Sequence, residues 1–369
     1  MHGVNQDFMP LEGWDHIELW VGNAKQCAYY YEHAFGFQPV AYSGPETGVR
    51  DRASYVLEQG AIRLVVTSAL RPDHEIARHA HTHGDGVKDV AFQVKDAGAA
   101  FRQAVEGGAT GIAEPSWVED EHGRVELASI ATYGETLHSF VNREEYEGAY
   151  LPGYQPLDGG NGKPQLGVGL ELVDHVVGNV ELGRMEHWVE FYERSLGFAQ
   201  LVHFTDEAIS TEYSALMSKV MTGGGGRFKL PINEPAEGKR KSQIEEYLEF
   251  YGGPGVQHIA MATSDIVKTV DALRERGVRF LQTPASYYDD VEQRVGEIGE
   301  DWSDLSRLRI LADRDDEGYL LQIFTNTVQD RPTLFFEVIE RHGAVGFGEG
   351  NFKALFEAIE REQALRGNL

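Results

Sequence analysis

The stretch VQHIAMATSDIVKTVDALRERGV, residues 256–278, decides the fold, because an earlier stretch repeats its pattern. VKDVAFQVKDAGAAFRQAVEGGA, residues 87–109, aligns with it without a gap at a constant offset of 169. Each copy has the pattern of an apolar strand followed by a helix that stops at glycine. The chain therefore contains an internal repeat of a strand–helix module.

A second pair of segments extends the repeat. WDHIELWVGNA (14–24) precedes a helical stretch that ends at Gly36-Phe37, and VDHVVGNV (173–180) precedes one that ends at Gly197-Phe198. Both helices stop at the same Gly-Phe dipeptide, and a glycine just past the last helical residue is the usual stop signal. Each half therefore holds two strand–helix units.

The length of 369 residues also favours two domains, since one core rarely grows beyond about 250–300 residues. The segment 149–167 is rich in proline and glycine and is predicted to be a linker between the halves. A weaker third match pairs ETLHSFVN (135–142) with PTLFFEVI (332–339) and adds further strands to each half.

Composition narrows the class of protein. Lys and Arg number 33 and Asp and Glu 59, for a net charge of −26 that repels nucleic-acid backbones. The single cysteine, Cys27, excludes an intrachain disulfide and agrees with a reducing compartment. The N-terminus lacks a secretory pattern, and no apolar run approaches 18 residues. We expect a soluble cytoplasmic protein with no nucleic-acid or membrane partner.

A carboxylate interrupts the apolar strand RPTLFFEVIERHG, residues 331–343. Glu337 lies between Phe336 and Val338, and a buried unpaired carboxylate is costly. It requires a cation, a metal ion or exposure to water. An ion pair with Arg307 or Arg309 remains an alternative to a metal.

The repeat comparison singles out two histidines on strands of the second half. His175 and His258 lie on predicted strands, each on the same face as its apolar neighbours two residues away. Two neutral imidazoles and one carboxylate form the facial triad that holds non-heme Fe(II) and leaves three positions open. We therefore predict a metal site at His175, His258 and Glu337.

The first half presents a different set at the aligned positions. His16 aligns with His175, Asp89 with His258, and Phe140 with Glu337. This half is expected to have kept the fold and lost the metal site. Two other motifs are discounted: HAHTHGDG (79–86) as a polar surface loop without a metal, and GGGG (223–226) as a connection between strands.

These residues resemble the 4-hydroxyphenylpyruvate dioxygenase family of the vicinal-oxygen-chelate superfamily. The resemblance covers essentially the whole chain, and the motifs that carry it are GVQHIAMAT (255–263), DRDDEGYLLQIFTN (313–326), LFFEVIERHG (334–343) and GFGEGNFKALFEAIEREQALRG (346–367). It implies an α+β fold of two tandem open-barrel domains built from paired βαβββ modules. Residues 1–150 would form a domain without metal, and residues 168–369 the catalytic domain with a C-terminal lid helix.

The resemblance also implies an activity. Fe(II) held by His175, His258 and Glu337 would convert 4-hydroxyphenylpyruvate and O₂ to homogentisate and CO₂. The reaction combines oxidative decarboxylation, ring hydroxylation and side-chain migration, with the substrate's own 2-oxo acid chelating the iron. The family forms homodimers or homotetramers, so a homo-oligomer is expected.

The pocket residues follow from the same motifs. Catalytic positioning is assigned by resemblance to Ser218, Asn233, Gln243 and Gln322. These four residues would also bind substrate, together with Pro231, Gln257, Phe324, Phe335, Asn351 and Phe352. Gln257 neighbours His258 on a strand, so its side chain is expected on the opposite face and its contact to be indirect.

The C-terminal segment is predicted to be an amphipathic helix. Phe352, Leu355, Phe356 and Ile359 recur at the spacing of one helix face. Its entry, GFGEGN, is flexible enough for a hinge, and in the family this helix covers the active site. The alternative is a docked helix that never moves.

Two other functions compete with the dioxygenase. Hydroxymandelate synthases use the same iron and substrate but hydroxylate the benzylic carbon. They typically carry an aliphatic residue at the position of Asn233 and differ at Pro231. Non-catalytic binding proteins of the same superfamily lack a full triad.

Overall fold

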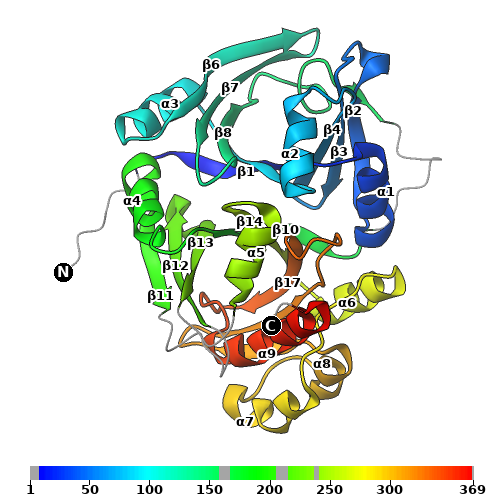
Figure 1. Cartoon of the computed structure of the whole chain (residues 1–369), viewed down its shortest axis with the longest axis vertical. Helices are drawn as coiled ribbons and strands as arrows, with labels where there is room; N and C mark the ends of the chain where they lie inside the picture. Colours follow the sequence, from blue (N-terminus) through cyan, green and yellow to red (C-terminus); the bar gives the residue numbers. More distant parts are fainter. Residues whose placement is uncertain (1–7, 158–166, 205–214, 237–240, 368–369) are drawn as a thin grey trace.

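The computed structural model describes residues 8–157, 167–204, 215–236 and 241–367. It confirms the predicted α+β class: each half of the chain forms one curled sheet with helices packed around it (Figure 1). Among the described residues, no helix is long and apolar enough to cross a membrane.

The first half contributes strands β1 to β9 and helices α1 to α3. Their bounds are β1 (Leu11–Trp20), α1 (Ala24–Phe35), β2 (Gln38–Ser43), β3 (Arg52–Gln59), β4 (Ile62–Ala69), α2 (Glu75–His83), β5 (Gly86–Val94), α3 (Ala97–Glu106), β6 (Gly111–Asp120), β7 (Gly123–Ala131), β8 (Leu137–Asn142) and β9 (Gln155–Pro156).

The second half contributes β10 to β17 and α4 to α9. Their bounds are β10 (Leu170–Asn179), α4 (Met185–Leu196), β11 (Ala199–Phe204), β12 (Ala215–Gly223), β13 (Phe228–Ala236), α5 (Gln243–Tyr251), β14 (Gly255–Thr263), α6 (Ile266–Glu275), α7 (Val291–Val295), α8 (Trp302–Leu308), β15 (Leu311–Arg314), β16 (Tyr319–Phe324), β17 (Phe335–His342) and α9 (Phe352–Arg366).

Each sheet joins two βαβββ modules side by side. The strand orders are β6-β7-β8-β5-β1-β4-β3-β2-β9 and β11-β12-β13-β10-β14-β17-β16-β15. The first strands of the two modules pair antiparallel, β1 with β5 and β10 with β14. Those central strands, flanked on both sides, are where inward-facing side chains of one sheet converge.

The structure confirms the repeat at the level of single residues. The offset of 169 carries the bounds of β5 and α3 onto those of β14 and α6. The helix stops also agree, because Gly36 and Gly197 cap α1 and α4 with φ angles of 76° and 68°. A left-handed backbone of this kind favours glycine.

The third match was aligned one residue out of register. In the parallel pairing of β5 with β8, Asp89 lies opposite Leu137, whereas in the pairing of β14 with β17 His258 lies opposite Phe335. The counterpart of Glu337 is therefore Ser139, not Phe140. A shift of one residue exchanges the two faces of a strand, and the two faces of β17 look alike because each carries apolar residues and one glutamate.

Two further predictions need correction. Within the predicted linker, Gln155 and Pro156 form β9, which pairs with β2 at the edge of the first sheet, and residues 158–166 lie outside the described residues. HAHTHGDG is not a surface loop, because its first five residues belong to helix α2 and both His79 and His83 are buried. The turn at Gly224–Gly226 does connect β12 and β13, as predicted.

Aromatic packing joins the two halves. Phe336 of β17 is fully buried against Tyr31 and Phe35 of α1, at ring distances of 5.7 and 5.1 Å. Trp14 of β1 lies 5.0 Å from Phe228 of β13. The strand that carries Glu337 is therefore fixed from outside by the first half of the chain.

Candidate metal centre and pocket

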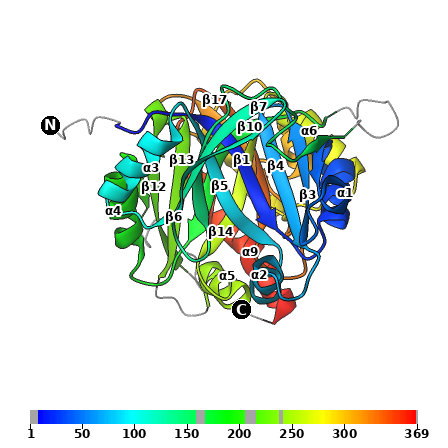
Figure 2. The same ribbon diagram turned by 90° about the horizontal axis from the view of Figure 1, so that it is seen from above.

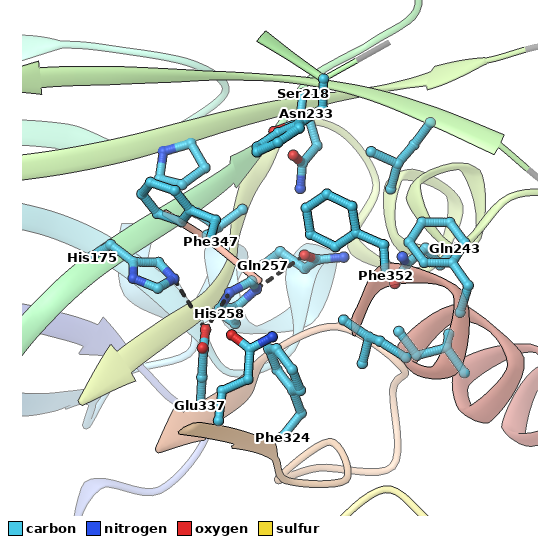
Figure 3. A pocket seen from close by; sticks show the side chains of 18 of the residues that line it. His175, Ser218, Asn233, Gln243, Gln257, His258, Phe324, Glu337, Phe347 and Phe352 are labelled. Carbon is cyan, nitrogen blue, oxygen red and sulfur yellow. Dashed lines mark hydrogen bonds and ion pairs between the residues drawn. The ribbon is translucent and has the colours of Figure 1, made fainter. Parts of the chain in front are cut away.

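The structure brings the three predicted metal ligands together. In the strand register, His175 of β10 and Glu337 of β17 both lie opposite Ala260 of β14, and His258 precedes Ala260 by two residues on the same face. Glu337 Oε2 lies 3.0 Å from His175 Nε2 and 3.4 Å from His258 Nε2 (Figure 3). All three side chains are buried.

The other ring nitrogens are oriented by acceptors. His175 Nδ1 donates to Asp174 Oδ1 at 2.7 Å, and His258 Nδ1 donates to Gln257 Oε1 at 3.1 Å. Carboxylate and amide oxygens accept only, so in both neutral rings Nδ1 carries the proton. Nε2 of each ring then faces Glu337, where a proton or a metal ion between nitrogen and carboxylate would stabilise the arrangement.

The spacing of these atoms fits a metal ion. Neighbouring ligands at bonds of about 2.1 Å lie about 3.0 Å apart in an octahedral shell. The separations of 3.0 and 3.4 Å approach this spacing without any rearrangement of the backbone. One face of the shell is then filled by protein and the opposite face is left for exogenous ligands.

Asp174 orients His175 and is itself anchored. Arg341 donates to both of its oxygens at 2.8 and 2.9 Å, and Lys229 lies 3.3 Å away. Burial opposes ionisation, but hydrogen bonds from His175 and Arg341 outweigh it and hold the pKa of Asp174 well below its usual range. Its carboxylate thus stays charged behind the imidazole.

Glu337 is likewise ionised. Burial alone would raise its pKa, but His175 and His258 outweigh burial and lower the pKa to about 2. The alternative of an ion pair with arginine is wrong: Arg307 binds Asp271 and Asp304, and Arg309 lies over the ring of Tyr288.

The triad opens into a pocket. Apart from Asn351, all the predicted substrate-binding residues line it: Ser218, Pro231, Asn233, Gln243, Gln257, Gln322, Phe324, Phe335 and Phe352. In Figure 3, Ser218, Asn233 and Gln243 lie across the pocket from the triad. The polar groups therefore form two sets, separated by aromatic walls.

Two predicted contacts are corrected. Asn351 does not line the pocket, because its Oδ1 accepts hydrogen bonds from Tyr287 at 2.5 Å and Arg294 at 3.3 Å. It anchors the entry to α9. Gln257 lines the pocket directly despite its place beside His258 on β14, since its long side chain reaches back to the imidazole.

Sequence reasoning missed part of the site. Further lining residues are Val177, Phe204, Leu216, Val220 and Phe347, together with Leu355, Phe356 and Ile359 of α9. The sequence pattern predicts that the three α9 residues share one helix face, but it does not show that this face lines the pocket. The repeated Asp-His dipeptides at 15–16 and 174–175 were a usable signal for the anchoring role of Asp174.

Helix α9 covers the pocket in this structure. Phe352 packs edge-on to Phe204 with ring centroids 5.0 Å apart, and Arg366 donates to Glu246 of α5 at 2.7 and 3.0 Å. At the entry, Gly348 has a φ of 76°, and an added Cβ would lie 2.3 Å from Gln322 Nε2. Because glycine has no Cβ, the backbone at position 348 leaves room for the side-chain amide of Gln322.

Comparison with known families agrees with this geometry. Residues 172–323 match the Glyoxalase/Bleomycin resistance protein/Dioxygenase superfamily. Residues 6–151 match the family described as Hydroxyphenylpyruvate dioxygenase, HPPD, N-terminal. The two matches fall on the two sheets.

Full-length relatives give the same result. The chain is 50% identical over 367 residues to 4-hydroxyphenylpyruvate dioxygenase of Dictyostelium discoideum, covering 97% of this chain and 100% of the relative. It is 49% identical over 362 residues to the enzyme of that name from Xenopus tropicalis, with 96% and 92% covered.

A solved structure is also similar. A triple mutant of 4-hydroxymandelate synthase from Streptomyces coelicolor superposes with a TM-score of 0.86 at 36% identity, over 96% of this chain and 100% of that one. The similarity confirms the fold, and it keeps 4-hydroxymandelate synthesis as a candidate reaction.

Proposed function

Because the chain belongs to the 4-hydroxyphenylpyruvate dioxygenase family, we propose that it converts 4-hydroxyphenylpyruvate and O₂ to homogentisate and CO₂. The substrate's carboxylate carbon leaves as CO₂ with its two oxygens, and both atoms of O₂ enter homogentisate. The observation that carries the proposal is the triad of His175, His258 and Glu337 at the inner end of a pocket that ends in neutral polar groups.

The charge balance of the pocket supports a dication. Among the described lining residues there is no lysine or arginine, and the charged group is Glu337. A 2-oxo acid brings a second negative charge into this space. An ion of charge +2 at the triad neutralises both carboxylates, whereas an empty triad would repel the substrate.

We propose that this ion is Fe(II). The two-histidine, one-carboxylate set leaves positions for the 2-oxo acid and O₂, and the reaction needs a redox-active metal. When bound, Fe(II) supplies Lewis acidity and the electrons that activate O₂. Neither zinc nor calcium at the same ligands would supply those electrons.

The protein's own residues position the substrate. We assign the phenol end to the neutral donors and acceptors Ser218, Asn233 and Gln243, and the oxo-acid end to the side of the triad near Gln322. Phe324 and Phe335 flank the ring between them; Phe335 also stacks on His258 with ring centroids 4.8 Å apart. A ring held at both ends presents one carbon to the reactive side, which favours one product.

Helix α9 closes the pocket with apolar side chains. Phe352, Leu355, Phe356 and Ile359 line the outer side of the pocket. We propose that this helix opens for substrate entry about the segment 346–351 and closes before O₂ reacts. A closed apolar lid excludes water, which would otherwise quench the oxidising equivalent.

A second candidate is 4-hydroxymandelate synthesis, favoured by the structural neighbour of that name. Two observations favour the dioxygenase: identity to dioxygenases is 46–50%, against 36% for the synthase, and the pocket contains Pro231 and Asn233. An aliphatic residue in place of Asn233 would leave one fewer partner for the phenol end.

Product analysis tests the proposal. The protein loaded with Fe(II) is mixed with 4-hydroxyphenylpyruvate in air, and the products are separated by chromatography and identified by mass. We expect homogentisate from the wild type and none from Glu337→Gln. 4-Hydroxymandelate would instead support the second candidate, and absence of any oxidised product would refute both.

Further features follow from the same family membership as proposals. We assign residues 1–150 to a domain without the catalytic iron site and residues 168–369 to the catalytic domain. We also propose a cytoplasmic location and a homodimer or homotetramer. Sedimentation of the purified protein tests the oligomeric state.

A further inference from the structure

A second cluster of possible metal ligands lies in the first half of the chain, away from the pocket. His79 and His83 are four residues apart on helix α2 and share one face. Glu135 approaches them from the turn between β7 and β8. One ligand atom from each residue lies within 4.8 Å of the other two.

The tautomer of His83 is determined by its environment. Its Nδ1 donates to the backbone carbonyl of Tyr251 at 2.5 Å, and a carbonyl accepts only. In the neutral ring the lone pair is therefore on Nε2, which lies 3.5 Å from Glu135 Oε2. Among the described atoms this buried Nε2 has no hydrogen-bond partner. A lone pair beside a carboxylate is unfavourable unless a cation lies between them.

His79 points to the same oxygen. Its Nδ1 lies 2.8 Å from Glu135 Oε2, and the ring is buried, with 2% of its surface exposed. This contact is a hydrogen bond, so a metal ion bound at Nδ1 would replace its proton and leave the proton on Nε2, which is buried and has no hydrogen-bond partner among the described atoms. Two imidazoles and one carboxylate converge on one point.

We propose that His79, His83 and Glu135 bind a divalent transition-metal ion, with Zn²⁺ as the probe, at a site separate from the pocket. Two nitrogens and one carboxylate oxygen suit this class of ion. Ligands at about 2.0–2.1 Å in a tetrahedral shell lie about 3.3–3.4 Å apart. The observed separations of 2.8 and 3.5 Å from Glu135 Oε2 lie on either side of that value.

The surroundings of the cluster support the site. The hydrogen bond from His83 Nδ1 to a carbonyl is the support that metal-binding imidazoles usually have. The side chain of Glu135 is 53% exposed, so a fourth position is accessible to water. The nearby Lys88 donates to the backbone carbonyl of Glu135 and lies over the ring of Trp20, so its ammonium group is held by groups other than the carboxylate.

The site lies where the two halves meet. Helix α2 packs beside α5 (Figure 2), and His83 reaches Tyr251 at the end of that helix. The first residue of α5, Gln243, lines the pocket. The ion would therefore stabilise the junction between the halves rather than take part in the reaction.

The test uses protein that cannot bind metal at the pocket. The double variant His258→Ala/Glu337→Gln keeps one pocket ligand, and it is stripped with chelator and titrated with Zn²⁺ by calorimetry. We expect one equivalent to bind and to raise the Tm by several degrees at about 100 times Kd. Visible ligand-field bands of Co²⁺ at the same stoichiometry would identify nitrogen and oxygen ligands.

Glu135→Gln added to this double variant should weaken Zn²⁺ binding at least tenfold and abolish the rise in Tm. Because the side chain of Glu135 is half exposed, we expect Glu135→Gln to fold normally, so that weaker Zn²⁺ binding reports the loss of a ligand. His81→Gln, an exposed histidine on the same helix, should leave the affinity unchanged. The inference is refuted if no Zn²⁺ binds, or if Glu135→Gln and His79→Gln leave the affinity at the parent value. Neither result bears on the proposed reaction.

Discussion

Replacing Asp174 by asparagine tests how the protein orients His175, the imidazole that we propose binds the metal. Asp174 accepts from His175 Nδ1 at 2.7 Å and from two nitrogens of Arg341 at 2.8 and 2.9 Å. Asparagine has the same shape but one accepting oxygen and one donating amide. If the oxygen serves His175, the amide faces the guanidinium; if it serves Arg341, the amide faces the imidazole.

Either orientation weakens the site. Loss of a carboxylate behind a metal-binding histidine typically reduces metal affinity 10- to 100-fold, or about 1.4–2.8 kcal/mol. We expect this loss in Asp174→Asn, measured by anaerobic Fe(II) titration against a competing chromogenic chelator. Stability should also fall, by about 3 kcal/mol, because Arg341 and Lys229 lose their buried counter-charge.

The first half supplies a matched control. Asp15 accepts from His16 Nδ1 at 2.7 Å and from two nitrogens of Arg143 at 2.7 Å, in the same arrangement. Asp15→Asn should lose stability to a similar extent and keep wild-type iron affinity. Wild-type affinity in Asp174→Asn, or an equal loss in Asp15→Asn, would refute the proposed support of His175.

Three further perturbations follow from the structure. Phe336→Ala removes a fully buried ring between the halves and should cost about 3–5 kcal/mol in urea unfolding; a loss below 1 kcal/mol would contradict the packing. Burial opposes ionisation of Asp15, but His16 and Arg143 outweigh it and lower the pKa of Asp15 below the unfolded value of about 3.9. Its contribution is complete above that value and is lost as pH falls through the folded pKa, so wild type should lose stability below about pH 4 more steeply than Asp15→Asn. Arg366→Ala removes the contact of α9 with Glu246 and should speed proteolysis at the C-terminus while iron affinity stays unchanged; equal proteolysis rates would show that this contact does not hold the helix.

The cluster of His175, His258 and Glu337 could be predicted from the sequence because the repeat located it independently of any structure. His175 and His258 lie on strands whose copies align without gaps, and Glu337 is a charge within an apolar strand. Alternation along a strand then predicts a shared face. The third strand could not be aligned to the residue, because its two faces look alike and no pattern distinguishes one register from the next.

Other features depend on contacts that no local pattern shows. The histidines of α2 lie in a polar stretch, and His83 packs against Tyr251, far along the chain. Asn351 points to Tyr287 rather than to the pocket that the adjacent Phe352 lines. In each case tertiary packing decides the environment, whereas sequence spacing predicts only the element.

The proposed role of the triad in an O₂-dependent conversion of 4-hydroxyphenylpyruvate is tested by a single turnover. Anaerobic protein with Fe(II) and substrate is exposed to ¹⁸O₂, and the product is analysed by mass spectrometry. We expect homogentisate with one label in the new ring hydroxyl and one in the carboxylate. Unlabelled homogentisate, a label at the benzylic carbon, or unreacted substrate with iron bound would contradict it.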